Sequence, residues 1–248
     1  MSGGNERYRY EWKYFLSLPQ AELMAGRLKQ HLKPDPHAVG GSYTSRSLYF
    51  DDWKNSAYEQ KLMGVYARQK WRVRTYNYSD DRISLERKKK RGNYIFKESA
   101  PLSREEFGQI LAGDFGFLLR RQENLCREFW VECTSALLRP KVIVDYRRTP
   151  LILKEGTVRL TFDEDVRAAV GSFDIFDPGL PVISAQEPDK VLLEVKYTEF
   201  LPRFIRQLLS DGAKEYHSFS KYVACFEAAR HLTNLSAGIG KSRLFMED

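Results

Sequence analysis

The sequence predicts an α+β fold in which about seven or eight β-strands are interspersed with helices. Several segments alternate charged residues with apolar or aromatic ones, the pattern of a strand whose two faces meet different surroundings. Other segments repeat apolar residues at helical spacing, and stretches containing Pro or Gly separate the two kinds. If these strands close into a barrel, we expect the charged faces to line an interior pore and the helices to cover the apolar outside.

The first half of the chain supplies four of the predicted strands. The alternation is sharpest in residues 7–16, where Tyr8, Tyr10 and Trp12 share one face and charged residues share the other. The remaining elements expected here are a helix at 19–33, a strand at 43–52, a short helix at 56–63, and a hairpin of strands at 71–77 and 83–90.

The second half begins with a helical region at residues 103–138. Gly113 and Gly116 are expected to divide it into two helices, and Ser103 with Glu106 has the spacing of a capping box. The elements expected after it are strands at 141–148, 158–166 and 191–197, and helices at 202–209 and 220–232, the last capped by Ser220.

The composition indicates a folded, basic protein. Hydrophobic residues make up 42% of the 248 residues, which is ample for a packed core and excludes a disordered chain. The net charge of +7 indicates an anionic partner without choosing among nucleic acid, lipid headgroups and small phosphates. The three cysteines lack metal-ligand spacing and are expected to be reduced core thiols.

No linker or repeat divides the chain. We therefore expect one domain over residues 1–232 and a flexible C-terminal tail over residues 233–248. Since no apolar run approaches the ~20 residues of a membrane span and no signal peptide is evident, we expect a cytoplasmic protein.

Four cations alternate along residues 68–74: Arg68, Lys70, Arg72 and Arg74. A strand places them on one face, about 7 Å from one to the next. Like charges at this spacing repel each other, so the pattern suggests that an anion lies against this face.

Other predicted strands mix cations with single carboxylates on their charged faces. These groups are Arg9, Glu11 and Lys13; Glu86 and Lys88; Arg159 and Asp163; and Glu194 and Lys196. A dry pore lined this way would be unstable, whereas one holding water, a polyanion and a divalent metal would be favourable. Arginine binds phosphate bidentately, and carboxylates bind Mg²⁺ or Mn²⁺. Arg87, Lys89 and Arg91 fall on the opposite face and are expected in solvent.

Eight short motifs occur in order along the chain. They are R-x-E-x-K (Arg9, Glu11, Lys13), Y-x-S-x-S-L-Y-F-D (Tyr43 to Asp51), R-x-R (Arg72, Arg74), E-x-K (Glu86, Lys88), Y-x-R (Tyr146, Arg148), R-x-T-x-D (Arg159 to Asp163), L-E-V-K-Y (Leu193 to Tyr197) and F-S-K-Y (Phe219 to Tyr222). Together they resemble the VTC domain, the polyphosphate polymerase domain of the vacuolar transporter chaperone complex, over roughly residues 7–230. That domain belongs to the triphosphate tunnel metalloenzymes, relatives of the CYTH group.

The resemblance implies a closed antiparallel eight-stranded β-barrel, the triphosphate tunnel, with helices packed around it. It implies phosphoryl transfer in which the catalytic residues are Lys88, Arg72, Arg74 and Glu194. The implied phosphate-binding residues are Arg9, Lys13, Arg72, Arg74, Lys88, Arg148, Arg159, Lys196 and Lys221. The implied ligand for Mn²⁺ or Mg²⁺ is Glu194, helped by Glu11, Glu86 or Asp163.

The sequence differs from the family pattern at one position and leaves the orientation of a second site residue open. Family members often have a lysine three residues before the lysine of F-S-K, and here that residue is Ser218. The predicted strand at 141–148 also places Arg147 and Arg148 on opposite faces, which leaves open which of them enters the tunnel.

The leading interpretation is a metal-dependent polyphosphate polymerase that transfers the γ-phosphate of ATP, or another nucleoside triphosphate, to a growing polyphosphate chain. The alternatives are a tripolyphosphatase or nucleoside triphosphatase using the same tunnel, and a non-catalytic polyphosphate-binding module. Coupling of synthesis to translocation would require a membrane partner.

The sequence does not support nucleotide binding by a glycine-rich loop, nor binding of nucleic acid. Residues 237–242 imitate a nucleotide-binding loop, but the required first glycine is replaced by Leu235. No nucleic-acid-binding motif accompanies the basic and aromatic residues, so no nucleic-acid partner is expected.

Overall fold

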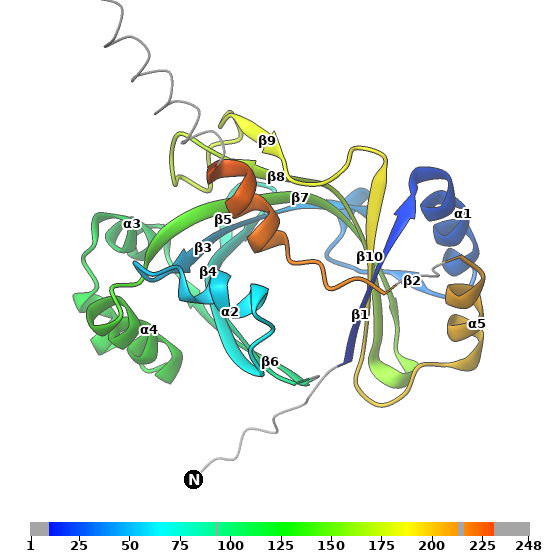
Figure 1. Cartoon of the computed structure of the whole chain (residues 1–248), viewed down its shortest axis with the longest axis horizontal. Helices are drawn as coiled ribbons and strands as arrows, with labels where there is room; N and C mark the ends of the chain where they lie inside the picture. The colour runs from blue at the N-terminus through cyan, green and yellow to red at the C-terminus, as the bar shows by residue number, and fades with distance from the viewer. Residues whose placement is uncertain (1–9, 93, 213–215, 231–248) are drawn as a thin grey trace, which may run out of the picture.

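The computed structural model describes residues 10–92, 94–212 and 216–230. A single antiparallel sheet forms its centre (Figure 1). The strands are β1 (Tyr10–Ser17), β2 (Lys33–Pro34), β3 (Tyr43–Asp51), β4 (Ala67–Tyr76), β5 (Ser79–Arg91), β6 (Tyr94–Leu102), β7 (Arg139–Leu153), β8 (Val158–Ala169), β9 (Val182–Ser184) and β10 (Lys190–Tyr197).

Helices connect and flank these strands. The α-helices are α1 (Leu18–Lys29), α2 (Ser56–Leu62), α3 (Arg104–Ala112), α4 (Asn124–Ser135) and α5 (Arg203–Gly212), and residues 221–230 are also helical. The short 3-10 helices are η1 (Val39–Gly41), η2 (Gly116–Arg120) and η3 (Glu155–Thr157). Within the described ranges, none of the helices has the length and apolarity needed to traverse a bilayer.

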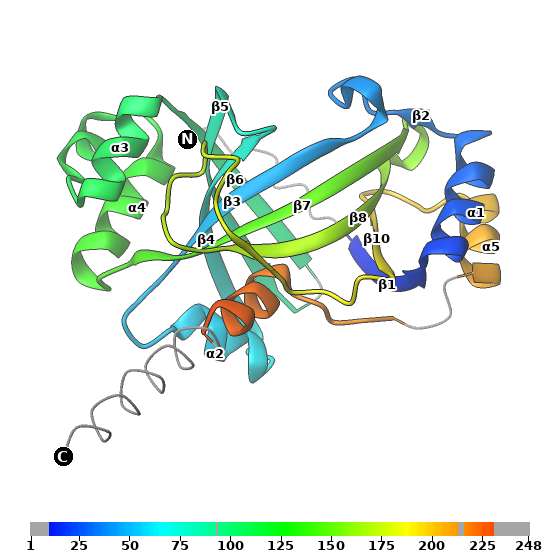
Figure 2. The same ribbon diagram turned by 90° about the horizontal axis from the view of Figure 1, so that it is seen from above.

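The prediction of a closed eight-stranded barrel is wrong. The sheet contains ten strands in the order β1-β10-β8-β7-β3-β4-β5-β6, with β2 paired to β7 and β9 paired to β8. Its two edge strands, β1 and β6, come into contact but form no hydrogen-bonded ladder in the described part of the chain. The sheet is therefore a curved, open trough, as Figures 1 and 2 show from two directions.

The trough stays open because another segment occupies the free edge of β1. Tyr14 forms an isolated antiparallel bridge with Tyr216, and the backbone N–H of His217 donates to the carbonyl of Lys13 at 2.9 Å. Those backbone groups are then unavailable to β6. A side-chain contact spans the opening instead, because Lys88 Nζ on β5 lies 2.8 Å from Glu11 Oε2 on β1.

Helices cover the convex face of the sheet at both ends, as the alternation of the strands predicts. At one end α4 packs Phe129 against Trp71 of β4, and α3 adds Phe107 to the same apolar cluster. At the other end α1 and α5 pack against a second apolar cluster that includes Leu160 of β8 and Leu193 of β10. These two hydrophobic cores therefore lie outside the trough and leave much of its concave face to other side chains.

A third apolar cluster fills one part of the concave face. Tyr222 and Cys225, from the helix at residues 221–230, pack there against Val142 and Val144 of β7 and Val166 of β8. Figures 1 and 2 show this helix (orange-red) lying against the sheet beside α2. The remaining concave surface is polar.

The local sequence signals for helix starts are confirmed. Ser103 and Glu106 form a capping box at the start of α3, and Ser220 Oγ accepts from the backbone N–H of Val223 at 3.4 Å. All three cysteines are free and buried, as expected. The predicted tail at residues 233–248 lies outside the described residues.

Candidate functional site

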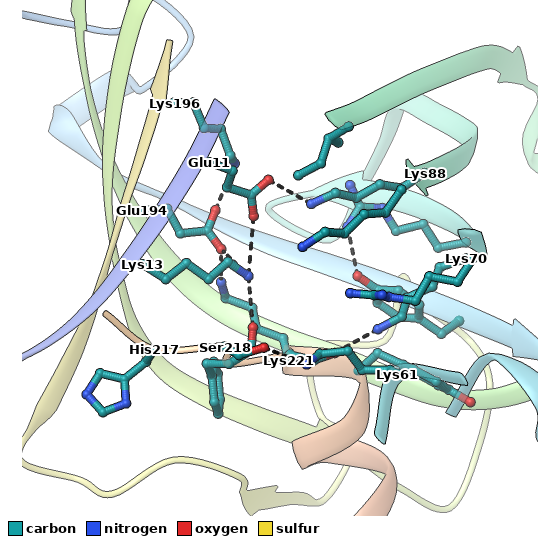
Figure 3. A pocket seen from close by; sticks show the side chains of 18 of the residues that line it. Glu11, Lys13, Lys61, Lys70, Lys88, Glu194, Lys196, His217, Ser218 and Lys221 are labelled. Carbon is teal, nitrogen blue, oxygen red and sulfur yellow. Dashed lines mark hydrogen bonds and ion pairs between the residues drawn. The ribbon is translucent and has the colours of Figure 1, made fainter. Parts of the chain in front are cut away.

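A cavity of about 170 Å³ lies on the polar part of the concave face (Figure 3). We call it the central cavity. Among the described residues, eleven lysines and arginines line it, but only two carboxylates, Glu11 and Glu194, do so. A hollow with this excess of positive charge is suited to a polyanion.

Strands β4 and β5 place two arginines of the cavity against a buried carboxylate. Glu86 Oε2 lies 2.7 Å from Arg72 Nε and 3.8 Å from Arg74 Nη1. Arg72 also donates to the Tyr49 hydroxyl at 2.8 Å, and Arg74 donates to the Tyr146 hydroxyl at 3.2 Å. Burial alone would raise the pKa of Glu86, but the two guanidinium groups outweigh it and hold the pKa well below its usual range. Both arginines are thus held in fixed orientations.

A second ionic cluster joins β7, β8, β10 and the helix at residues 221–230. Arg148 donates to both oxygens of Asp163 at 2.6 Å. Lys221 Nζ lies 2.6 Å from Asp163 and 2.9 Å from Glu194. Burial opposes the charged form of Arg148 and of Lys221, yet the carboxylates outweigh it and raise both pKa values. Each cation of this cluster therefore has a carboxylate partner.

A third cluster lies where β1 meets β10. Cross-strand pairing sets Lys13 opposite Glu194 and Glu11 opposite Lys196. Lys13 Nζ lies 3.3 Å from Glu11 and 3.5 Å from Glu194, and Lys196 Nζ lies 2.7 Å from Glu194. Burial would raise the pKa of Glu11, but Lys88 and Lys13 outweigh it and lower the pKa well below its usual range. Both carboxylates that line the cavity are therefore ionised.

Tyr146 lies between the first two clusters, and the sequence motifs assigned it no role. It is 2% exposed, and Arg148 and Lys221 lie over its ring at 5.0 and 4.8 Å from the centroid. Burial opposes ionisation of its hydroxyl, but Arg148 and Arg74 outweigh burial and lower the pKa of Tyr146 to about 7.

Asp51 fixes the two helices that border the cavity. Its carboxylate accepts from the backbone N–H groups of Ala57 and Tyr58 in α2, at 2.9 and 3.1 Å. The Tyr222 hydroxyl donates to the same carboxylate at 2.6 Å. A carboxylate at a helix N-terminus satisfies unpaired N–H donors. Asp51 therefore links the position of α2 to that of the helix that carries Lys221.

The structure brings most of the predicted site residues together. Those that line the central cavity are Lys13, Arg72, Arg74, Lys88, Arg148, Lys196, Lys221, Glu11 and Glu194. Glu86 and Asp163 are buried behind the cavity as partners of its arginines. Arg159 does not join them, because it pairs with Asp35 at 2.8 Å and donates to the Tyr43 hydroxyl at 3.1 Å. Arg9 lies outside the described residues.

The structure resolves one open question about arginine orientation and corrects one expectation. Arg148 faces the cavity, whereas Arg147 is exposed and pairs with Glu164. The expectation that Arg87 lies in solvent is wrong. It is 2% exposed, lies over the Trp71 ring and pairs with Glu98 of β6 at 2.7 Å.

Four cavity cations were not among the predicted site residues: Lys61, Arg68, Lys70 and Lys90. Strand alternation provides a signal for three of them, because Arg68 and Lys70 continue the series of Arg72, and Lys90 shares the face of Glu86 and Lys88. For Lys61, on α2, the sequence gives no signal. Its Nζ donates at 2.8 Å to Ser218 Oγ, at the position where family members often carry lysine.

The donor set of the cavity is compatible with Mg²⁺ or Mn²⁺. Glu11 and Glu194 supply carboxylate oxygens on adjacent strands, and Mg²⁺ commonly takes one or two carboxylates and completes its shell with water and substrate phosphates. Glu86 and Asp163 fit less well, because arginine and lysine already bind their oxygens. Among the residues with described coordinates, no group of three or more His, Cys, Asp or Glu could hold a metal unaided.

These features define the class of the molecule: it is an α+β protein whose open antiparallel sheet surrounds a cation-lined cavity. Its sequence matches the VTC domain over residues 8–230, and the chain belongs to that family, as its motifs predict. No curated protein sequence matches it.

Two solved structures are similar in fold. HpAC1 from Hippeastrum, assigned as an adenylyl cyclase and described as having a dominant triphosphatase activity, has a TM-score of 0.53 at 15% identity and covers 89% of this chain and 95% of its own. A protein of Bacillus halodurans assigned as an adenylate cyclase has a TM-score of 0.52 at 11% identity, with coverage of 86% and 93%.

Proposed function

We propose that this protein is a metal-dependent polyphosphate polymerase. It transfers the γ-phosphate of ATP, or of another nucleoside triphosphate, to a polyphosphate chain held in the central cavity. The observation that carries the proposal is the lining of a single cavity by eleven cations and two ionised carboxylates. Membership of the VTC domain family supports it.

The arginines are the residues best placed to orient the phosphates. The guanidinium groups of Arg72, Arg74 and Arg148 are fixed by carboxylates and tyrosines before any ligand arrives. Phosphoryl transfer depends mainly on alignment and on neutralising the charge of the transferred group. A preorganised set of cations supplies both without reorganisation during the reaction.

The lysines distribute positive charge over the rest of the substrate. Lys13, Lys196 and Lys221 surround Glu194, and Lys88 reaches across the opening of the trough. Lys88 is assigned a catalytic role because its side chain, 35% exposed at the opening, can move its ammonium group from Glu11 to a phosphate.

Glu194 and Glu11 would hold Mn²⁺ or Mg²⁺. When bound, the metal would neutralise phosphate charge and make phosphorus more electrophilic. The cationic neighbours of Glu194 keep this carboxylate ionised, because they outweigh its burial and lower its pKa well below the usual range.

One assay distinguishes this function from its alternatives. Purified protein is incubated with ATP and Mn²⁺, and the products are resolved on a polyphosphate gel while free phosphate is measured. Long chains support the polymerase; free phosphate without chains indicates a hydrolase; metal-assisted binding with neither product indicates a binding module.

Two variants test the assigned residues in the same assay. We expect Lys88→Ala and Glu194→Gln each to lower turnover at least a hundredfold, a loss typical of removing one preorganised charged contact to the transition state. Lys89→Ala is the control, because Lys89 lies on the other face of β5 and pairs with Glu98 at 3.5 Å. Wild-type turnover in either site variant, with unchanged thermal stability, would reject that assignment.

Triphosphate or nucleotide hydrolysis is the second candidate, and one feature favours it. The helix at residues 221–230 fills part of the concave face with Tyr222, Cys225 and their apolar neighbours. A cavity bordered in this way suits a short substrate whose products leave by the side on which it entered.

A further inference from the structure

The cations of the central cavity fall into two groups that differ in charge compensation. Those deepest in the cavity are paired: Arg72 with Glu86, and Arg148 and Lys221 with Asp163. The four that the motifs did not include are Lys61, Arg68, Lys70 and Lys90, which we call the outer cluster. Within the described ranges, no carboxylate lies at ion-pair distance from any of the four.

The cross-strand pairs of β4 and β5 locate the boundary between the groups. Arg72 is paired with Glu86, so this rung of the ladder carries opposite charges. The next two rungs on the same face pair Lys70 with Lys88 and Arg68 with Lys90. Like charges directly opposite each other destabilise a sheet. Of these cations only Lys88 has a carboxylate partner, and that partner is across the opening, on β1.

Neutral groups hold three of the four cations of the outer cluster in place. Lys70 Nζ donates to Ser220 Oγ at 2.7 Å, and Lys61 Nζ donates to Ser218 Oγ at 2.8 Å. Arg68 donates to the carbonyl of Val65 at 2.5 Å. The serine contacts direct both ammonium groups along the cavity wall without neutralising them (Figure 3).

The electrostatics of the outer cluster are opposite to those of the inner cations. Burial and the neighbouring cations lower the pKa of Lys61 and of Lys70, the latter well below its usual value. The pKa of Lys90 is also lowered, first by burial and then by Arg68 and Lys88. A bound anion at ion-pair distance would reduce this repulsion and favour the charged forms of the lysines.

The extent of the cation series indicates the shape of that anion. By strand rise, Arg68 and Arg74 lie roughly 20 Å apart along β4. A triphosphate is too short to contact cations over the whole of this length. We propose that the outer cluster is a second phosphate-binding subsite, which takes the part of a linear polyphosphate that extends beyond the inner three phosphates and does so without a metal. This subsite rests on the proposed function, because the same chain occupies both groups of cations.

The test compares the affinity of the purified full chain for tripolyphosphate and for long-chain linear polyphosphate. Lys61→Ala and Lys70→Ala should weaken binding of the long chain about tenfold each, the loss of one charge-assisted hydrogen bond. Binding of tripolyphosphate should change less than about threefold in the same variants. Arg72→Ala, in the inner group, should weaken both ligands. Lys89→Ala, on the opposite face of β5, should weaken neither.

Each outcome has one meaning. A loss confined to the long chain supports the outer subsite. Equal losses for both ligands overturn it, since the cluster would then belong to the triphosphate site, and so does the absence of any loss. If the wild-type chain binds neither ligand, the proposed function itself fails, and that result is distinct because it needs no variant.

The stability of the unliganded variants provides a second readout. Removing an uncompensated cation relieves repulsion, so Lys70→Ala should melt at the same temperature as the wild type or higher. A markedly lower melting temperature would show that Lys70 is a structural residue and would overturn its assignment to a ligand subsite.

Discussion

Tyr146 is the residue whose chemistry the cavity changes most. Its hydroxyl is buried, yet Arg148 and Arg74 lower its pKa to about 7, so we expect it to ionise near neutral pH. A titration of tyrosinate absorbance should reveal one group with a midpoint near pH 7, well apart from the tyrosines that ionise near pH 10. Because the folded pKa lies below the unfolded one, ionisation of Tyr146 stabilises the folded state; this contribution is complete above about pH 10 and is lost as the pH falls from 10 to 7.

Two variants determine whether the titrating group is Tyr146. Tyr146→Phe should remove the transition near pH 7 and leave the rest of the titration unchanged. Tyr43→Phe is the control, because burial outweighs the neighbouring arginines at Tyr43 and raises its pKa. A transition that persists in Tyr146→Phe would assign it to another group.

At the scale of single residues, alternation predicts which face a side chain occupies but not its position along the trough. Arg159 and Lys196 are cross-strand partners, so the two share a face as predicted. Arg159 nevertheless lies outside the cavity, because it forms an ion pair with Asp35, a loop residue distant from it in the sequence. Lys61, by contrast, lines the cavity although the sequence did not predict it. Asp51 caps the N-terminus of α2 and so helps to place Lys61 at the cavity, and alternation along a strand cannot predict a contact made by a helix.

At the scale of elements, the turn between β7 and β8 depends on Gly156. Its φ of 70° is unfavourable for other residues, and a Cβ there would lie 2.2 Å from the carbonyl oxygen of Phe200. We expect Gly156→Ala to lower the free energy of unfolding by about 2 kcal/mol or more, measured by urea denaturation.

The control for this substitution is Gly108→Ala in α3. Gly108 lies inside the helix, and a Cβ added there would meet no atom of another segment within 4 Å. Here alanine should raise the free energy of unfolding by about 0.5–1 kcal/mol, because glycine is the poorer helix former. Equal effects of the two substitutions would contradict the role assigned to the turn.

The elements that the sequence predicts are those with strong periodicity. All seven strands expected from alternation are present, and the hairpin turns at Asn77 and Tyr78, both with positive φ. Strand β6 has no counterpart among the predictions. Its sequence, YIFKESAPL, contains Pro101 and places Ile95 and Phe96 side by side, so its alternation is too weak to identify.

At the scale of the whole molecule, closure of the sheet depends on information that alternation does not contain. Whether β1 pairs with β6 depends on which segment occupies the free edge of β1. The segment at Tyr216 and His217 reaches it, although some 200 residues separate it from β1. The prediction of a charged interior does not depend on closure of the barrel. Alternation within each strand sets which face its charged side chains occupy, and the open trough still brings these charged faces around one cavity.

The excess of positive charge in the cavity also predicts how the molecule responds to ligands. Repulsion among the cations disfavours the folded state, and a bound polyanion removes it. Tripolyphosphate at a hundred times its dissociation constant should stabilise the fold by about 2.7 kcal/mol. For a chain of this length, the melting temperature should then rise by about 5–10 °C.

Sodium chloride of equal ionic strength is the control for this prediction. It screens the charges without binding in the cavity, so it should produce a much smaller rise in melting temperature. The Arg72→Ala variant should melt with a smaller ligand-induced shift than Lys89→Ala, since only Arg72 lines the cavity. Equal shifts with tripolyphosphate and with sodium chloride would mean that screening, and not a phosphate site, accounts for the response.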